Sequence, residues 1–498
     1  MSTHSWTVST NFISTNSRPT QTRGWCGEQG RSLKSDSRRP RASGVRCSML
    51  DEAISLSALA PAASDFLSTL SAAMLPPLNE ASSVDLGLRL GGSILGFLYL
   101  LSPPNVMNGL LDRLFLKAID ARSEDNWGPD DISPKVGRTL GKGTFGLAYE
   151  AFTTSEGRKK LKGRRDEEGR VVIKRCLDDD QADIEAYFNR RVRRLGKQAY
   201  FATFLGAQRR AGDVMGPGRL LVWNFEGSRT LESYMMEPSF PLNLESLVLY
   251  RRQANPKEEF KTPKFGGKAR SEETEKREVE VIKRIAANTL TALKTLHDAG
   301  VVHRDVKPAN ILVAETAEGA PLRLIDLGAC VDLRNGFNFD PEKGLLDPRY
   351  APPEQYIMPQ DVPKPPKGVL ALLASPFLWQ AMSPDRFDTY SVGIMLMQMA
   401  IPQLRNVANI KVVSTQLKDV EYDVQAWRER YGTTMDFSLL DRCNFAGWDL
   451  VCQLVRSRDS NRRGRFSASD ALSHRYFRPE SLSSIGSVPA GSRTLVRK

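Results

Sequence analysis

The pattern of apolar and polar positions predicts a strand-rich region followed by a helical one. Apolar and polar residues alternate around 141–148 and along 170–174, which favours two paired strands. Further apolar strands are predicted over 220–226 and over 322–325. Between them, apolar residues recur at helical spacing over 279–296, which predicts a long helix with one buried face. This mixture indicates an α+β fold.

A longer apolar stretch precedes these elements. Residues 90–111 contain no charged side chain over 22 positions, close to the roughly 20 residues that a helix needs to cross a bilayer. Pro103 and Pro104 end or kink a helix, so its best part runs over 84–102. We predict a transmembrane or membrane-associated segment at 84–111, with a buried or interfacial helix as the alternative. Basic residues follow it, which favours a stromal or cytoplasmic C-terminal side.

The N-terminal residues differ in composition from the rest. Residues 1–47 are rich in Ser, Thr and Arg, and eight basic against two acidic residues give them a charge of +6, half of the chain's +12. Because they lack the apolar core of a secretory signal, they predict an organelle transit peptide that ends near Cys47. A plain basic tail is the alternative. Residues 48–83 are predicted as a connector, and 478–498 as a disordered tail.

The overall composition is that of a globular protein. With 498 residues, 41% hydrophobic and 26% charged, the chain is expected to bury a sizeable core. Outside 1–47 it is only mildly basic, so its charge does not indicate a nucleic-acid partner. Six scattered cysteines fit neither a disulfide framework nor a CxxC zinc motif, which favours a reducing compartment.

The stretch 303–310, HRDVKPAN, carries the most specific chemical pattern. Asp305 can accept the proton of a substrate hydroxyl, and Asn310, five residues on, can hold a magnesium ion. Sixteen residues after Asn310, Asp326 opens the triplet Asp-Leu-Gly and supplies a second magnesium ligand. The stretch resembles the catalytic loop of protein kinases, and the resemblance implies phosphoryl transfer that uses ATP and Mg²⁺.

A glycine-rich turn precedes these motifs and is expected to cover the nucleotide. Gly141, Gly143 and Gly146 have the spacing that lets the backbone approach phosphates. Leu140 and Ala148 are expected to bind the nucleotide beside them. Ala148 stands where glycine-rich turns of this kind usually have Val, so less apolar surface is expected to cover the adenine.

Lys174 ends the apolar run 170–174 and is predicted to anchor the phosphates. Its expected partner is Glu185, eleven residues downstream on a predicted helix. The acids at 178–180 and Asp183 compete for this role, and any one of them is equally an ordinary surface charge.

These motifs, in this order, resemble the eukaryotic-type protein kinases over 127–477. Further motifs fit that order, namely 352–354 (Pro-Pro-Glu), 388–393 (Asp-Thr-Tyr-Ser-Val-Gly) and 465–472. Arg465, with Arg463 as a rival, is expected to pair with Glu354. The resemblance implies a bilobal fold with a small β-rich N-lobe and a larger α-helical C-lobe.

The catalytic stretch also indicates the class of kinase. Lys307, two positions after the catalytic Asp305, resembles the serine/threonine form and is expected to take part in catalysis. All the charged positions that phosphoryl transfer needs are filled, which favours an active enzyme over a catalytically inactive kinase-like membrane scaffold.

The runs at 351–358, 378–380 and 384–388 resemble the thylakoid state-transition family of plant chloroplast protein kinases. The resemblance implies a thylakoid enzyme with its kinase domain in the stroma. One branch phosphorylates light-harvesting antenna proteins and has two cysteines before the membrane segment. This chain has no cysteine from 48 to 175, so it is closer to the branch that phosphorylates photosystem II core proteins. Antenna proteins or other stromal substrates are the alternative, and a soluble stromal kinase is a further one.

The activation segment is unusual because no Ser or Thr lies between Asp326 and Glu354. We hypothesise that Asp340, Glu342 or Asp347 replaces a phosphate by pairing with Arg304. All three positions carry an acidic side chain. A long insert follows, and its apolar stretch over 369–379 is either a docking surface or extra packing. Cys330 is either a redox-sensitive thiol or an inert packing residue.

Overall fold

The computed structural model describes eleven segments of the chain. They are 83–111, 127–143, 146–161, 169–176, 178–208, 219–249, 271–315, 319–338, 347–354, 368–456 and 464–478. The predicted transit peptide at 1–47, nearly all of the connector at 48–83 and the tail at 478–498 apart from its first residue lie outside them. Two compact units are distinguished, Thr7–Gly96 and a larger unit that includes Phe97–Lys498. The following description concerns the larger unit and, by itself, helix α2, whose residues 83–96 belong to the smaller one.

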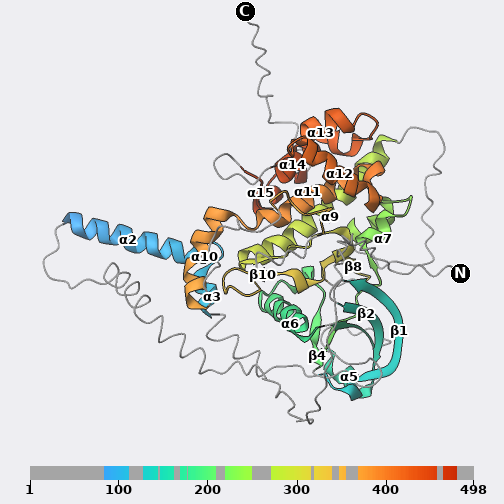
Figure 1. Cartoon of the computed structure of the whole chain (residues 1–498), viewed down its shortest axis with the longest axis horizontal. Helices are drawn as coiled ribbons and strands as arrows, with labels where there is room; N and C mark the ends of the chain where they lie inside the picture. Colours follow the sequence, from blue (N-terminus) through green and yellow to red (C-terminus); the bar gives the residue numbers. More distant parts are fainter. Residues whose placement is uncertain are drawn as a thin grey trace, which may run out of the picture. The chain divides into compact units, whose positions relative to one another are not determined.

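The N-terminal lobe is built on one antiparallel sheet of five strands (Figure 1). Its order is β1 (Ile132–Gly143), β2 (Gly146–Thr153), β3 (Arg170–Cys176), β5 (Leu220–Asn224) and β4 (Phe204–Gln208). Alternation along β3 buries Val171 and Ile173 on one face, where they pack with Leu205 and Val222. The strands predicted from alternation around 141–148, along 170–174 and over 220–226 are therefore confirmed.

Two helices accompany this sheet. The short α5 (Ser155–Lys160) follows β2, and α6 (Asp179–Arg194) follows β3. Asp178 caps α6 by accepting the backbone N–H of Asp180, and basic residues fill the last turn, as the helix dipole favours. The buried face of α6 packs against β3, β4 and β5.

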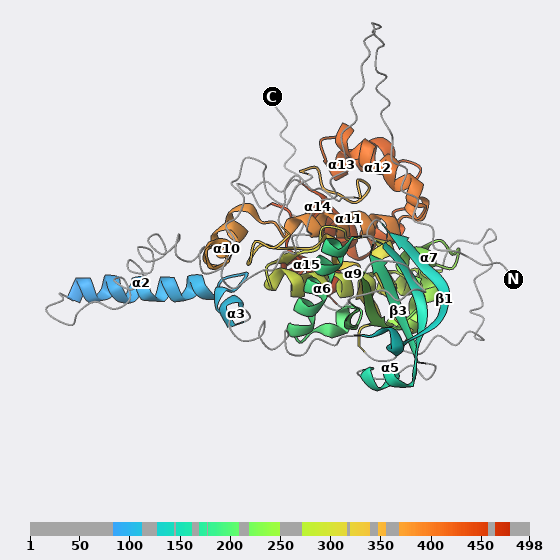
Figure 2. The same ribbon diagram turned by 60° about the horizontal axis from the view of Figure 1, so that its bottom comes forward.

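The C-terminal lobe is helical. Its helices are α7 (Leu231–Met235), α8 (Glu245–Leu249), α9 (Glu272–Asp298), α10 (Val369–Met382), α11 (Arg386–Ala400), α12 (Val407–Asp419), α13 (Val424–Tyr431), α14 (Ser438–Val455) and α15 (Ala468–Leu472). The backbone of α14 is interrupted by a kink at 442–445. The predicted helix over 279–296 forms the C-terminal part of α9, and its apolar positions are buried. Helix α11 lies against α9 and α14 (Figure 2) and is buried from Phe387 onward. The predicted bilobal α+β fold is confirmed.

Short strands form two further small sheets. One small sheet has the order β6 (Arg229–Thr230), β8 (Ile311–Val313) and β9 (Leu322–Leu324). The other pairs β7 (Val301–Val302) with β10 (Val331–Asp332). The predicted strand over 322–325 corresponds to β9.

The apolar stretch before the kinase region forms α2 (Ser83–Leu101) and α3 (Val106–Leu111). Helix α2 ends before Pro103, as the two prolines predict. Among the residues that the structure describes, no helix is long and apolar enough to cross a membrane, so the predicted span over 84–111 is not supported.

Candidate active site

The predicted catalytic stretch lies between β7 and β8, and its polar side chains converge on one carboxylate. Lys307 Nζ donates to Asp305 Oδ1 at 2.9 Å, and Asn310 Nδ2 donates to Asp305 Oδ2 at 2.9 Å. Asn310 Nδ2 also lies 2.8 Å from the backbone oxygen of Asp305. Both carboxylate oxygens are therefore oriented by neighbours, as a proton acceptor for a substrate hydroxyl requires.

Asp388, at the start of α11, holds the loop 303–310 through hydrogen bonds to its backbone. It is fully buried and accepts the backbone N–H groups of His303 and Arg304, each at 2.8 Å. Its Oδ2 lies 2.8 Å from His297 Nε2 at the end of α9. Burial alone would raise the pKa of Asp388, but the bonds from His297 and His303 lower it. The loop thus rests on an ionised carboxylate that ties it to two helices.

Lys174 on β3 bridges two carboxylates. Its Nζ donates to Glu185 Oε2 at 2.8 Å and to Asp326 Oδ1 at 2.9 Å. The structure thus brings together the expected pair of Lys174 and Glu185, the latter on the buried face of α6. Two of the competing acids have other partners, because Asp178 caps α6 and Asp183 pairs with Arg219, directly before β5.

The pKa directions of these three groups follow from burial and mutual charge. Burial alone would lower the pKa of Lys174, but the charges of Asp326 and Glu185 raise it. Burial raises the pKa of Glu185, which Lys174 opposes and the charge of Asp326 reinforces. Burial would also raise the pKa of Asp326, but Lys174 lowers it. Asp326 is therefore the carboxylate that stays ionised for an incoming cation.

Asp326 and Asn310 fit a magnesium ion that also binds phosphates. Asp326 adopts φ 60° and ψ 70°, a left-handed conformation that a non-glycine residue adopts at a cost of about 1 kcal/mol. Its side chain is 22% exposed. Asn310 uses its amide nitrogen on Asp305, which leaves its amide oxygen as the metal-binding atom. Mg²⁺ in such sites takes one or two carboxylates together with substrate phosphates.

Strand register aligns the nucleotide-binding residues predicted from the glycine-rich turn. Ala148 on β2 lies opposite Gly141 on one side and opposite Lys174 on the other. Gly143 pairs with Gly146, and the tip at 144–145 lies outside the described residues. Leu140, also on β1, is buried. A Cβ on Gly146 would lie only 2.2 Å from a carbonyl oxygen of β3, so close strand packing requires glycine there.

A buried pair that sequence reasoning missed joins β5 to α6. Trp223 on β5 lies beside Val172 of β3 and is 8% exposed. Its Nε1 donates to Asn189 Oδ1 of α6 at 3.1 Å. The only sequence signal was a polar residue, Asn189, on the apolar face of a helix.

The activation segment differs from the expectation for Arg304. Asp347 receives a two-pronged bond from Arg349, at 2.8 and 2.6 Å, and lies 3.7 Å from Lys307 Nζ. Arg304 Nε donates to the backbone oxygen of Ala329. The proposed pairing of Asp347 with Arg304 is therefore wrong, because Arg349 bonds both carboxylate oxygens of Asp347. The other two acids, Asp340 and Glu342, lie outside the described residues.

The end of the activation segment is fastened as expected. Arg465 donates to both oxygens of Glu354, at 2.7 and 3.2 Å. Its side chain is fully buried, so removal of Glu354 would leave a buried charge. The rival Arg463 lies outside the described residues.

Cys330 is a packing residue. It is fully buried in the main core, and burial raises its pKa well above the ordinary thiol value. A redox sensor needs an accessible thiolate, so the structure favours the alternative that this cysteine is inert.

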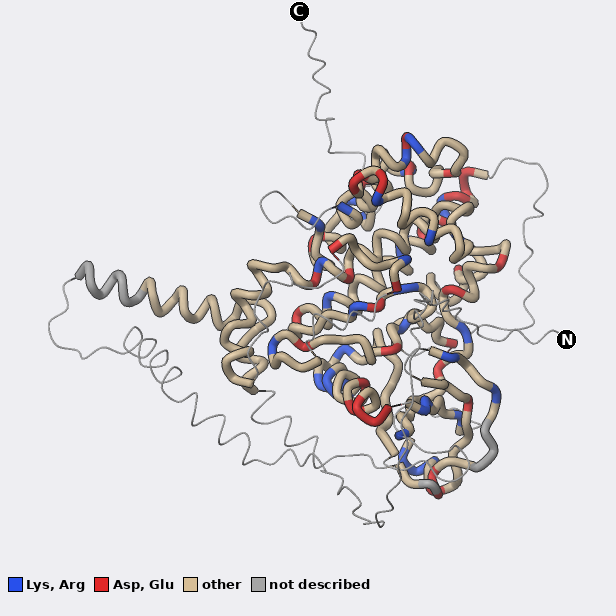
Figure 3. Tube along the Cα trace, in the orientation of Figure 1, with Lys and Arg blue, Asp and Glu red and all other residues tan. Residues whose placement is uncertain are grey.

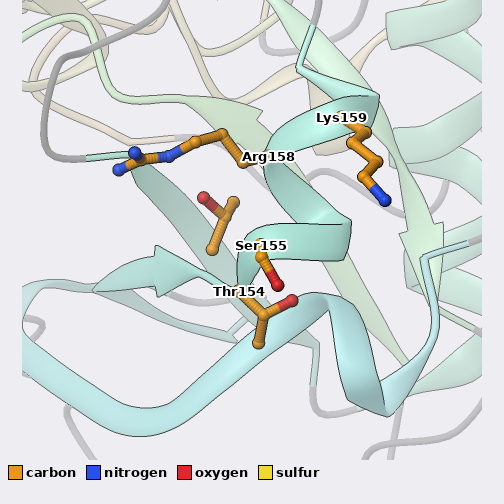
Figure 4. Close-up of a pocket in the computed structure, with 5 residues that line it drawn as sticks. Thr154, Ser155, Arg158 and Lys159 are labelled. Atoms are coloured by element: carbon orange, nitrogen blue, oxygen red, sulfur yellow. The ribbon is translucent and has the colours of Figure 1, made fainter.

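A separate pocket of about 350 Å³ lies at α5 (Figure 4). It is lined by Thr153, Thr154, Ser155, Arg158 and Lys159. Arg158 and Lys159 extend to opposite sides of the helix (Figure 4), so they do not converge on one ligand. None of the residues of the catalytic region lines this pocket.

Comparisons with known proteins agree with this geometry. The protein kinase domain family matches residues 266–477, and the protein tyrosine and serine/threonine kinase family matches 135–358. The chloroplastic serine/threonine-protein kinase STN8 of Arabidopsis thaliana is 38% identical over 408 residues, 76% of this chain and 77% of that protein. STN7 of the same plant is 35% identical over 414 residues, 82% of this chain and 67% of that protein.

A solved structure extends the likeness to three dimensions. It is the crystal structure of a Stt7 homolog from Micromonas algae soaked with ATP, with a TM-score of 0.57 and 30% identity. The match covers 72% of this chain and 95% of that one. By these identities and coverages, the chain belongs to the family of chloroplast serine/threonine protein kinases that includes STN7 and STN8.

Proposed function

We propose that this kinase transfers the γ-phosphate of ATP to serine or threonine hydroxyls of thylakoid proteins, with photosystem II core subunits as its main substrates. The observation that carries the activity is the bridge from Lys174 Nζ to both Glu185 and Asp326, at 2.8 and 2.9 Å. This contact holds α6 and the Asp-Leu-Gly triplet in the arrangement that phosphate binding needs. The crystal structure of the Stt7 homolog soaked with ATP supports the choice of nucleotide.

Each residue has a defined role in this proposal. Asp305 accepts the proton of the attacking hydroxyl, and Lys307 neutralises charge beside it. Lys174, held by Glu185, binds phosphate oxygens. The glycine-rich turn covers them through Gly141, Gly143 and Gly146, while Leu140 and Ala148 contact the base.

Asn310 and Asp326 would hold the magnesium ion in this proposal. Bound there, Mg²⁺ neutralises charge on the phosphates. The protein's own contribution is to orient both ligands before the nucleotide arrives, through the bonds of Asn310 to Asp305 and of Asp326 to Lys174.

The relatives and the N-terminal sequence support the proposed location. STN7 and STN8 are chloroplastic proteins, and residues 1–47 have the composition of a transit peptide. We place the enzyme at the thylakoid membrane with the kinase domain in the stroma. The choice of photosystem II core subunits over antenna proteins rests on the absence of cysteine from 48 to 175.

The test uses the full chain, radiolabelled ATP and heat-treated, salt-washed thylakoid membranes as substrate. We expect labelled threonines on photosystem II core subunits, identified by mass spectrometry. Asp305→Asn is expected to abolish transfer while ATP binding stays measurable. Asp441→Asn, which breaks an ion pair with Arg428 outside the catalytic region, is the matched control and is expected to retain transfer.

Other outcomes separate the alternatives. Retained transfer in Asp305→Asn would contradict the catalytic assignment, and no transfer by the unaltered chain would indicate an inactive scaffold. Label confined to antenna proteins would replace the substrate proposal and leave the kinase assignment intact.

A further inference from the structure

Asn189, a buried polar residue of α6, connects the five-stranded sheet to the helix backbone at Glu185. Its Oδ1 accepts a hydrogen bond from Trp223 Nε1 of β5 at 3.1 Å, and its Nδ2 donates to the backbone oxygen of Glu185 at 2.8 Å. The amide thus uses its acceptor toward the sheet and a donor toward the helix, one turn earlier in the chain. Two hydrogen bonds in series therefore join the indole of Trp223 to the residue that pairs with Lys174.

Trp223 and Lys174 lie on the same face of the sheet. Trp223 is paired with Val172 of β3, and Lys174 follows Val172 two residues later on that strand. Because side chains alternate between the two faces of a sheet, Val172 and Lys174 point to the same side. Val172 packs against the cluster that contains Trp223, so this side is the one that α6 covers. The distance between Lys174 and Glu185 therefore depends on how α6 packs on this face.

The indole of Trp223 is held firmly by its neighbours. Strand β5 lies between β3 and β4 in the sheet, and the ring of Phe204 on β4 meets the indole edge-on with the centroids 5.3 Å apart. Leu221 of β5 and Ala186 of α6 belong to the same buried cluster. A side chain packed on several sides has few alternative rotamers, so the indole N–H is aimed at Asn189 in a defined direction.

The charged residues of α6 lie mainly at its two ends. Its first turn is acidic and its last turn is basic, and Figure 3 shows acidic and basic positions at opposite ends of this helix. Arg191, near the C-terminal end, pairs with Asp332 of β10, which is outside the five-stranded sheet. Glu185 lies between these ends, and Asn189 supplies a buried hydrogen bond from this part of the helix to the sheet. This bond therefore contributes directly to the distance between Glu185 and Lys174.

We propose that Trp223 and Asn189 are positioning residues for phosphoryl transfer, because their hydrogen bond fixes α6 on the sheet where Glu185 reaches Lys174. In this arrangement Lys174 Nζ lies 2.8 Å from Glu185 Oε2. Neither Trp223 nor Asn189 has to touch the reacting atoms for this role. The inference rests on the proposed function, in which Lys174 binds phosphate oxygens.

A displaced α6 predicts a specific kinetic defect. If Glu185 moves away, Lys174 keeps its bond to Asp326, 2.9 Å long, and is no longer held between two carboxylates. Its ammonium group is then poorly placed for the phosphates, so the KM for ATP rises. A purely structural role would instead reduce the amount of folded enzyme, which lowers the measured rate and leaves the KM for ATP unchanged. The KM for ATP therefore separates the two roles.

The first test compares Trp223→Phe and Asn189→Leu in the full chain, each of which removes the bond between the two side chains. We expect the KM for ATP to rise at least about fivefold in each variant, and the KM for a threonine peptide to stay within about twofold. The dissociation constant for the fluorescent nucleotide N-methylanthraniloyl-ATP is expected to rise by a similar factor. Each variant tests the proposal by itself, so one of them suffices if the other does not fold.

A second tryptophan of the chain supplies the matched control. Trp427 on α13 is fully buried, and its Nε1 donates to Gln416 Oε1 of α12 at 3.0 Å. Trp427→Phe and Gln416→Leu therefore remove the same kind of bond from the C-terminal lobe. We expect both control variants to keep the KM for ATP within about twofold of the unaltered chain. Urea unfolding establishes which of the four variants are folded in the assay.

Two combined variants test whether the residues act through one bond and through Glu185. In the Trp223→Phe, Asn189→Leu double variant, we expect the KM for ATP to stay within about twofold of the larger single effect, since the bond can be lost only once. In a chain that already carries Glu185→Gln, Asn189→Leu is expected to change the dissociation constant for N-methylanthraniloyl-ATP by less than about twofold. The glutamate that Asn189 positions is absent from that chain.

Three results would overturn the proposal. They are an unchanged KM for ATP in folded Trp223→Phe or Asn189→Leu, an equal rise in the two control variants, and single effects that multiply in the double variant. No transfer by the unaltered chain would contradict the proposed function instead. The binding of N-methylanthraniloyl-ATP would still measure the effect of the pair in that case, because it needs no turnover.

Discussion

Asp332 on β10 and Arg191 on α6 form an ion pair in the interior, with Arg191 Nε 3.0 Å from Asp332 Oδ2. Both side chains are buried, at 0% and 1% exposure. Tyr187 donates its hydroxyl to the same oxygen at 2.9 Å, and Asn335 Nδ2 donates to it at 3.0 Å. The carboxylate of Asp332 thereby fastens the start of the activation segment to the helix that carries Glu185.

This pair predicts the effect of Asp332→Asn. The substitution removes the buried carboxylate that faces the buried Arg191 guanidinium, and we expect the unfolding free energy to fall by about 3 kcal/mol. We also expect kcat to fall about tenfold or more, because α6 loses the contact that sets the position of Glu185. Urea unfolding and a peptide phosphorylation assay measure the two effects.

The control for Asp332→Asn is Asp183→Asn, on the same helix. Asp183 pairs with Arg219, but its side chain is 54% exposed, so we expect less than about 1 kcal/mol of destabilisation and normal kcat. Equal effects of the two substitutions would show that the burial of the Asp332 pair has no special role in positioning α6.

The position of Asp347 predicts that its substitution lowers kcat and leaves the KM for ATP nearly unchanged. It holds Arg349 with two bonds and lies 3.7 Å from Lys307 Nζ, whose other partner is Asp305. In Asp347→Ala, Lys307 loses this second carboxylate, and we expect kcat to fall about tenfold. The KM for ATP is expected to stay within about twofold, since the bonds of Lys174 are untouched.

The matched control is Asp441→Ala, which removes a similar two-pronged bond, from Arg428, at 2.7 and 2.6 Å. Steady-state kinetics with a threonine peptide are expected to show normal kcat for this variant. A KM for ATP that rises in Asp347→Ala while kcat holds would contradict a role beside Asp305.

The sequence predicted the parts of the site that depend on local spacing. Lys174 and Glu185 are eleven residues apart on adjacent elements, and phosphate binding demands such a pair. The pair of Trp223 with Asn189 had no comparable signal, because each residue alone is ordinary and the contact depends on how α6 packs on the sheet.

The same limit explains the error at Asp347. An acid in the activation segment was expected to neutralise Arg304, since charge alone decided the pairing. The sequence between β10 and Glu354 has no repeating apolar pattern that would predict which way a side chain points. In the structure, the Asp347 carboxylate lies near Lys307. The sequence left open whether the apolar stretch over 369–379 packs or stays exposed. In α10 it does both, since Leu372 is buried and Phe377 is exposed.

Burial predicts the order of thiol reactivity. Cys330 and Cys176 are buried, and burial raises the pKa of Cys176 to about 12 and that of Cys330 well above its usual value. Cys443 and Cys452 are partly exposed. Burial also raises the pKa of Cys452, to about 11. We therefore expect N-ethylmaleimide to label Cys443 of the native protein at least about tenfold faster than Cys330 and Cys176, as peptide mapping by mass spectrometry measures. Rapid labelling of Cys330 in the folded enzyme would instead restore the redox interpretation.

The lowered pKa of Asp388 predicts how stability depends on pH. Its pKa lies below the ordinary value of 3.8 in the folded protein. Its stabilising contribution is therefore complete above the unfolded pKa and is lost as pH falls through the folded one. Asp388→Asn cannot titrate, so we expect the difference in unfolding free energy between the two proteins to be largest near pH 7. The difference is expected to shrink below about pH 4.

Urea unfolding at a series of pH values measures this difference. Ser391→Ala serves as the control, because it removes a buried hydrogen bond of 2.9 Å from the same helix α11 without removing a titrating group. Its difference from the unaltered protein is expected to be constant with pH. If the Asp388→Asn and Ser391→Ala differences run parallel down to low pH, the charge of Asp388 does not support the catalytic loop. In that case the hydrogen bonds that Asp388 accepts from His303 and Arg304 stabilise the loop without a contribution from its charge.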